Sequence, residues 1–151
     1  MDVLQMWEAF VKHKSIEEIM NDKGLAKVGD GIVNLCYSLA KSRVLGHATG
    51  DKVRDSVLAR AIRATTAYKH ISRRTDSGRA ADAYEAIIAY LWMKGTITIQ
   101  GTVDTLVQTL HIDSKTNRKK EAEIAAHSFQ YFIEQYIDSL PNSLNVRCRN
   151  A

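Results

Sequence analysis

The chain has 151 residues, of which 45% are hydrophobic and 25% charged, a composition typical of one soluble globular domain. It has neither the apolar run of about 18 residues that a membrane span needs nor a secretory signal at its start, so we expect a cytoplasmic protein. The 21 Lys and Arg outnumber the 17 Asp and Glu, and the net charge of +4 permits a polyanionic partner without requiring one.

The pattern of apolar residues predicts an all-α fold of about six to seven helices. Apolar side chains recur mostly at intervals of three and four, and the single proline is Pro141. Ser15 and Glu18 have the spacing of a capping box, which marks the start of a short helix. The alternating segment TITIQG is expected to be an extended link, since a lone strand would have no partner. The predicted helices cover residues 3–13, 15–21, 25–44, 51–71, 79–94, 102–111 and 118–140, in one domain over residues 1–140 with a tail over 141–151.

Two carboxylates stand in the most apolar of these helices, in the segment RAADAYEAIIAYL. At 100° per residue, Asp82 and Glu85 lie within about 60° of each other on the helix face that Ala86 and Ala89 continue. A carboxylate on such a face needs a cation, a metal ion or a proton. A structural salt bridge to an arginine and a metal site both satisfy this requirement, and the segment alone does not separate them.

A third acid, Asp30, lies between two glycines in the segment VGDGIVNL. Glycine is unfavourable inside a helix by about 1 kcal/mol relative to alanine, so Gly29 and Gly31 indicate a close backbone approach at this point. Alternatively, Asp30 lies at the edge of a narrow polar stripe of the same helix, formed by Lys27, Asn34, Ser38 and Lys41.

Together, VGDGIVNL and RAADAYEAIIAYLW resemble the two signature segments of the ribonuclease III family. The first matches a glycine-aspartate helix, and the second matches an aspartate-x-x-glutamate-alanine helix followed by aromatic and leucine residues. The resemblance extends over residues 25–109. It implies an all-α endonuclease domain that cleaves double-stranded or structured RNA as a homodimer.

The resemblance also implies the site. Asp30, Asp82 and Glu85 match acids that hold Mg²⁺, or Mn²⁺, in the family, and Glu85 stands where the acid most directly tied to catalysis lies. Such an ion needs hard oxygen ligands and would activate water and neutralise charge on a phosphate. The family's further glutamates are replaced by Lys23 and Ala26, which leaves open whether one or two metal ions bind. These replacements favour a bare catalytic domain like the short bacterial and compact archaeal members, or a non-catalytic RNA-binding or ribosome-associated relative.

Two basic groups are candidate RNA contacts, because Lys and Arg supply most of the non-specific affinity for phosphate. The first group lies between the two signature helices and the second before the last helix. A solvated basic surface is the alternative for both, and a helical protein-interaction module is the alternative for the whole chain. The candidates are Lys69, His70, Arg73, Arg74 and Arg79 in the first group and Arg118, Lys119 and Lys120 in the second.

Overall fold

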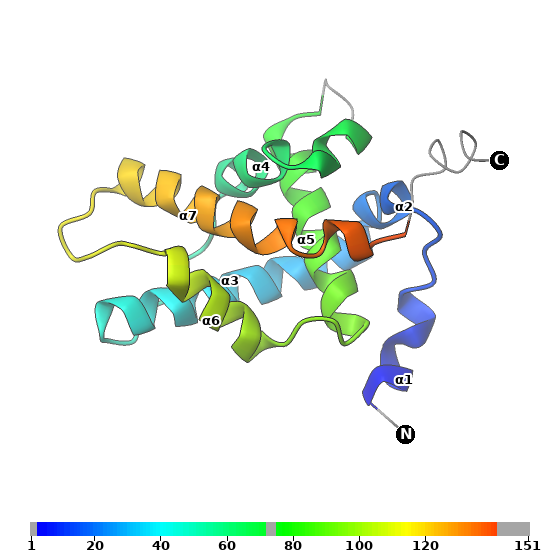
Figure 1. Cartoon of the computed structure of the whole chain (residues 1–151), viewed down its shortest axis with the longest axis horizontal. Helices are drawn as coiled ribbons and strands as arrows, with labels where there is room; N and C mark the ends of the chain where they lie inside the picture. The colour runs from blue at the N-terminus through cyan, green and yellow to red at the C-terminus, as the bar shows by residue number, and fades with distance from the viewer. Residues whose placement is uncertain (1–2, 72–74, 142–151) are drawn as a thin grey trace.

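The computed structural model describes residues 3–71 and 75–141, and within these ranges the chain is all-α, as predicted, with no strand. Seven α-helices and three short 3-10 helices follow one another along the chain (Figure 1). The α-helices are α1 (Val3–Trp7), α2 (Ile16–Met20), α3 (Lys23–Leu45), α4 (Asp55–Arg63), α5 (Ser77–Met93), α6 (Ile99–Thr109) and α7 (Arg118–Glu134), and the 3-10 helices are η1 (Glu8–Phe10), η2 (Thr66–His70) and η3 (Ile137–Ser139). Most of the predicted tail, residues 142–151, lies outside the described ranges.

Helix α5 is the centre of the fold. It crosses α3 steeply and also contacts α2 and α4 (Figure 1). A helix that is packed on several sides needs small side chains where its neighbours approach, and α5 supplies them as five buried alanines. These are Ala80, Ala81, Ala83, Ala86 and Ala89. The apolar character of this segment therefore reflects burial around most of the helix circumference.

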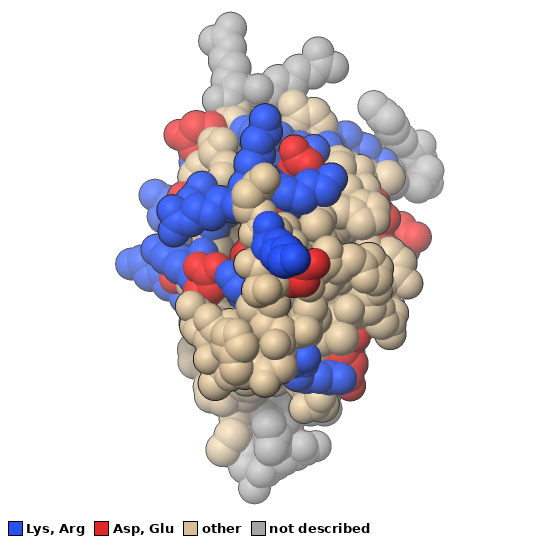
Figure 2. All heavy atoms as spheres, turned by 90° about the vertical axis from the view of Figure 1, so that its left-hand side faces the viewer, with Lys and Arg blue, Asp and Glu red and all other residues tan. Residues whose placement is uncertain are grey.

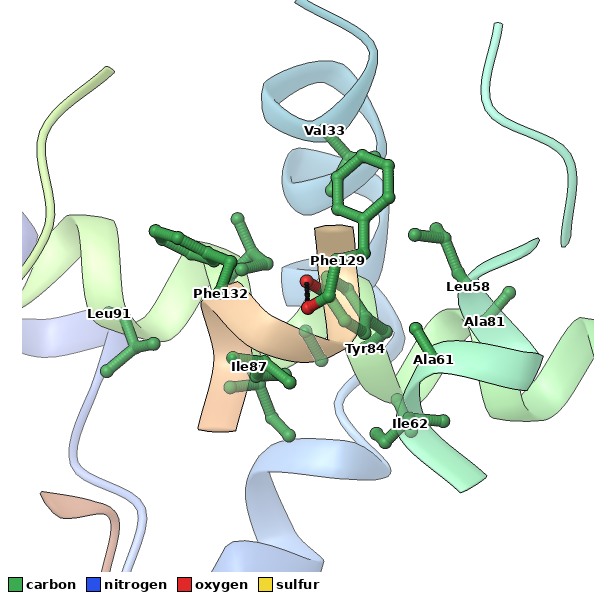
Figure 3. Close-up of a cluster of buried hydrophobic side chains, with 14 of the residues drawn as sticks. Val33, Leu58, Ala61, Ile62, Ala81, Tyr84, Ile87, Leu91, Phe129 and Phe132 are labelled. Carbon is green, nitrogen blue, oxygen red and sulfur yellow. Dashed lines mark hydrogen bonds between the residues drawn. The ribbon is translucent and has the colours of Figure 1, made fainter. Parts of the chain in front are cut away.

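Helix α7 closes the core over α4 and α6. Its Phe129 packs edge-on against Tyr84 of α5, with ring centroids 5.7 Å apart (Figure 3). The Tyr84 hydroxyl is fully buried and donates a 2.6 Å hydrogen bond to the Phe129 carbonyl oxygen. A buried hydroxyl without a partner would cost about 1–3 kcal/mol, so this bond allows a tyrosine at the centre of the core.

The backbones of α3 and α5 approach most closely at Gly29 and Glu85. A Cβ atom built on Gly29 would lie 1.8 Å from the Glu85 carbonyl oxygen and 2.4 Å from its carbonyl carbon. No side chain larger than hydrogen fits there. Gly31 differs, because a Cβ atom at that position would meet nothing within 4 Å. Of the two glycines that flank Asp30, only Gly29 is therefore required by the helix crossing.

The predicted helix over residues 51–71 is wrong at both ends. Residues 51–54 are not helical, because side chains of α3 bind their backbone: Ser38 Oγ accepts from Asp51 N at 2.9 Å and Asn34 Oδ1 accepts from Val53 N at 2.8 Å. Helix α4 then ends at Arg63. Thr65 adopts an extended conformation, and its hydroxyl caps η2 by accepting from Ala67 N.

Three other boundaries also differ from the prediction. The first predicted helix is shorter and passes into η1, after which the chain turns so that Val11 is buried. Helix α6 begins inside the predicted extended link, because Thr98 Oγ1 accepts from Gly101 N and caps a helix there. Helix α7 ends at Glu134 and η3 follows. The capping box at Ser15 is confirmed, since Ser15 Oγ accepts from Glu18 N at 3.2 Å.

The two glycines beside Asp30 provide a matched pair of substitutions. Gly29→Ala should lower the free energy of unfolding by about 3 kcal/mol or more, because α3 and α5 must separate to admit the methyl group. Gly31→Ala should raise it by about 0.5–1 kcal/mol, since the methyl group enters open space and alanine favours the helix. Urea denaturation of both variants measures these changes, and similar stabilities for the two would contradict the steric account.

Candidate functional site

Glu85 and Asp30 form a carboxyl pair at the crossing of α5 and α3. Glu85 projects from the middle of α5 and is only 5% exposed, and its carboxyl lies close enough to that of Asp30 for the two groups to interact. The pKa of Glu85 is raised from its ordinary 4.5 to about 9, mainly by burial and then by the neighbouring Asp30 carboxyl, with smaller contributions from the charges of Asp82 and Asp55. Two carboxyl groups in such contact favour a shared proton or a cation. The structure thus brings together two of the three predicted site acids.

Asp82, the third predicted acid, lies at the edge of this pair and faces solvent. Its pKa is raised, first by partial burial of the carboxyl and then by the negative charge of Asp55, with smaller contributions from Asp76 and Asp30. The charge of Lys23 acts in the opposite direction. Asp82 is therefore close to several other carboxylates, and this crowding makes its own negative charge unfavourable.

Asp55 is a fourth acid near these three, and it is not among the residues predicted from the sequence. It is the first residue of α4, and its negative charge raises the pKa of both Asp82 and Glu85. An aspartate in the first turn of a helix is ordinarily explained by the helix dipole, so the local sequence carries no signal of another role. Only the packing of α4 beside α5 brings Asp55 to the other acids.

Asn34 ties the site to the loop that precedes α4. Its Nδ2 donates to Asp30 Oδ1 at 3.2 Å, and its Oδ1 accepts from Val53 N at 2.8 Å. One amide side chain thus orients Asp30 and fixes the loop that leads into Asp55. Asn34 was predicted only as part of the polar stripe of this helix, a position that gives no indication of this bridge.

The salt-bridge alternative finds no support in residues 3–71 and 75–141. No Lys or Arg nitrogen in these ranges lies within 4.0 Å of a carboxylate oxygen of Asp30, Asp82 or Glu85. Lys23 is close enough to influence Asp82 but forms no ion pair with it. The acids of this site therefore face mainly one another.

The donor chemistry of the site suits a hard divalent cation. Four carboxyl groups offer oxygen ligands, and burial and then their mutual repulsion raise the pKa values of Glu85 and Asp82; a cation would relieve that repulsion. In their present rotamers, no three His, Cys, Asp or Glu residues of the described chain are spaced to hold one ion. Asp55 and Asp82 are exposed, and the charge of each acts on Glu85.

The basic residues predicted to contact RNA are distributed over two places. Arg79 and His70 line a pocket of about 340 Å³ together with Asp82 and Lys23, directly beside the acids. Lys69 is exposed close by in η2, whereas Arg73 and Arg74 lie outside the described residues. His70 is held by Glu17, whose Oε1 lies 3.0 Å from His70 Nδ1.

The second basic group lies at the start of α7. Arg118, Lys119 and Lys120 are all exposed, and Lys120 Nζ lies 3.7 Å from Glu123 Oε2. The structure therefore places Arg79 and His70 beside the acids and the second group on a different helix, α7, which packs against α4.

A comparison with protein families decides the identity of this fold. A family model described as ribonuclease III matches residues 23–140, which include the four acids and both signature segments. The chain belongs to the ribonuclease III family. No curated protein sequence gives a significant match.

Membership of the ribonuclease III family supports an RNA-processing, nuclease-like function with RNA as the substrate class. The match begins at the first residue of α3, so the family region contains the helices that carry the acids and the helix that closes the core. Among the described helices, none is long and apolar enough to cross a lipid bilayer.

The raised pKa of Glu85 predicts how the stability of the metal-free ribonuclease III domain depends on pH. Folded Glu85 keeps its proton up to about pH 9, whereas the unfolded chain loses it near 4.5, so the folded state binds more protons between these values. The free energy of unfolding should therefore fall as the pH rises from 5 to 9. Glu85→Gln should remove much of this slope, and urea denaturation in the presence of a chelator measures it.

Glu134→Gln is the matched control for this measurement, because Glu134 is exposed on α7. It should retain the slope of the wild type. A slope in Glu85→Gln as steep as that of the control would show that Glu85 is not the group responsible.

Proposed function

We propose that the protein is a divalent-metal-dependent endoribonuclease that hydrolyses phosphodiester bonds in double-stranded or structured RNA. The observation that carries this proposal is the buried Glu85 carboxyl beside the half-buried Asp30 at the Gly29 crossing, with no cationic side chain as a partner for either among the described residues. Burying a carboxyl next to a second one is costly, and a purely structural core would be more stable with an apolar residue at Glu85.

The proposed ligands of Mg²⁺ or Mn²⁺ are Asp30, Asp82 and Glu85, with Asp55 as a fourth candidate. A bound ion would supply positive charge against the phosphate and activate water for attack on phosphorus. Glu85 is held in place by the helix crossing, and Asn34 orients Asp30. Asp82 faces solvent, where it can reach an ion and the phosphate of a substrate at the same time.

The pocket lined by Lys23, His70 and Arg79 lies next to Asp82 and is the proposed place for the RNA backbone at this site. Lys23 and Arg79 are exposed, and neither forms an ion pair within the described residues. A-form duplexes are bound mainly through backbone contacts and shape, so we expect weak sequence preference.

Metal binding and cleavage can be tested together with one substitution. Mg²⁺ or Mn²⁺ should raise the melting temperature of the wild type by about 5–10 °C at 100 times the dissociation constant, because the ion relieves repulsion among the acids. Glu85→Gln should gain far less from the metal and should no longer cleave a long RNA duplex. Differential scanning calorimetry and gel analysis of the RNA measure the two effects.

Glu134→Gln again serves as the control and should match the wild type in both measurements. If the wild type binds duplex RNA but gains no stability from metal and cuts nothing, the protein is the non-catalytic RNA-binding relative. If Glu85→Gln still cuts RNA at the wild-type rate, the proposed catalytic role of this acid is wrong.

We also propose that the protein acts as a homodimer through the outer face of α3. Val28, Leu35 and Leu39 are 42%, 48% and 41% exposed, and they lie with Ile32 along one side of this helix. The same helix carries Asp30. A second copy of the chain would cover this apolar stripe and would bring the two acidic sites into one assembly.

A charge on the α3 stripe should separate the subunits. Leu35→Glu should shift the protein from dimer to monomer, because the carboxylate would be desolvated in the interface. Tyr131→Glu is the control, since Tyr131 is similarly exposed, at 42%, but lies on α7. Analytical ultracentrifugation measures the mass of both variants, and a wild type that is monomeric at high concentration would overturn this proposal.

A further inference from the structure

A second pocket with cationic side chains lies at the loop that leads into Asp55. It has a volume of about 200 Å³ and is formed by the loop before α4 and the first turns of α7. Three cationic side chains form its rim: Lys52, Arg54 and Arg118. We call it the Arg54 pocket. Of these three residues, only Arg118 was among the predicted RNA contacts.

The two carboxylates of the Arg54 pocket already have partners within it. Lys41 Nζ lies 2.9 Å from Asp51 Oδ2 and 3.0 Å from Glu121 Oε2. The Tyr37 hydroxyl donates a further hydrogen bond to Glu121 Oε2 at 2.7 Å. Burial raises the pKa of the Tyr37 hydroxyl, and so does this carboxylate, so the tyrosine remains a neutral donor. The inner wall of the pocket is thus a closed network that needs no external ligand.

The rim of the Arg54 pocket, in contrast, has excess positive charge. Lys52, Arg54 and Arg118 are exposed, and within residues 3–71 and 75–141 none of them has a carboxylate oxygen within 4.0 Å. Figure 2, which faces the left-hand end of Figure 1, shows Lys and Arg side chains gathered in its upper half. Four cations against two carboxylates line the pocket, and this excess favours an anionic ligand.

The Arg54 pocket is fixed to the acidic site by the backbone. Arg54 immediately precedes Asp55, whose charge acts on Asp82 and Glu85. The amide of Val53, in the same loop, donates to Asn34, which in turn donates to Asp30. The loop that lines this pocket is therefore joined directly to two of the acids, through the chain at Asp55 and through Asn34 at Asp30.

We propose that the Arg54 pocket binds a phosphodiester group of the RNA strand that the acidic site cleaves, beyond the scissile phosphate. The strand then runs from the Lys23 and Arg79 pocket past Asp82 and Asp55 to Lys52, Arg54 and Arg118. This inference rests on the proposed function and adds the second point at which the strand is held. Phosphate is the chemical class that converging Lys and Arg side chains select.

Binding of duplex RNA as a function of salt tests the Arg54 pocket. The parent protein is Glu85→Gln, in which the RNA remains intact, and the variant adds Lys52→Ala and Arg54→Ala. Two lost phosphate contacts should lower the slope of log K against log salt by about 1.4–1.8 and weaken binding about tenfold or more at 0.1 M salt. Fluorescence anisotropy with a labelled duplex measures both quantities.

Two controls make this result specific. Lys14→Ala with Lys94→Ala removes the same charge from exposed lysines elsewhere, and it should leave the slope unchanged. Lys52→Arg with Arg54→Lys keeps the charge in the pocket and should retain most of the slope. A Lys52→Ala, Arg54→Ala protein that folds normally and binds with the parent's slope would overturn the inference, as would an equal loss in the Lys14 and Lys94 control.

Binding of RNA duplexes in which a single phosphate is ethylated shows which phosphate of the strand contacts the Arg54 pocket. Modification of one phosphate beyond the cleavage position should weaken binding of the parent but not of the Lys52→Ala, Arg54→Ala variant. If inorganic phosphate at millimolar concentration removes the difference between parent and variant, the pocket is a site for a free anion instead, and the inference is wrong.

The inference and the proposed function fail separately in these experiments. If the Lys52→Ala, Arg54→Ala variant has a lower salt slope but the wild type does not cleave RNA, the pocket binds RNA and the proposed nuclease activity is wrong. If the wild type cleaves RNA but the variant keeps the parent's salt slope, the nuclease activity stands and the role of the pocket is wrong. A parent protein with no affinity for duplex RNA would reject both.

Discussion

The close approach of α3 and α5 at Gly29 is the constraint on which the rest of the structure depends. The Glu85 carbonyl occupies the space that any side chain at Gly29 would need. Because the backbones meet there, the carboxyl groups of Asp30 and Glu85 come close enough for Asp30 to raise the pKa of Glu85. A glycine thus sets both the packing of the central helix and the position of the site.

This arrangement places carboxyl groups that repel one another in a well-packed core. Burial and neighbouring negative charges raise the pKa of Glu85 to about 9, and the same crowding raises that of Asp82. Functional sites often retain such unfavourable groups because their ligand relieves the strain. The elements around these acids are joined by hydrogen bonds. Tyr84 is fully buried and donates to α7, and Asn34 joins α3 to the loop before α4.

Cationic side chains lie near these acids in two pockets. Lys23 and Arg79 line one pocket together with Asp82, and the Arg54 pocket is lined by the residue that immediately precedes Asp55. A polyanion attracted to both groups of cations would lie over the acids, where the proposed metal ion would compensate the negative charge. This distribution of charge is consistent with an RNA backbone that crosses the site.

The amino-acid sequence by itself determined the all-α class, most of the helices and the family, and it singled out three of the four acids that the fold brings together. These follow from local periodicity and from two short segments, whose residues carry their own signal. Tertiary structure alone decided the start of α4, the positions of Asp55 and Asn34, and the Arg54 pocket. Each depends on contacts between residues far apart in the chain, such as Val53 with Asn34 or Lys41 with Glu121. No local pattern encodes such contacts. The sequence around an aspartate at a helix start, or around an arginine in a loop, does not specify which distant residues the fold brings against it.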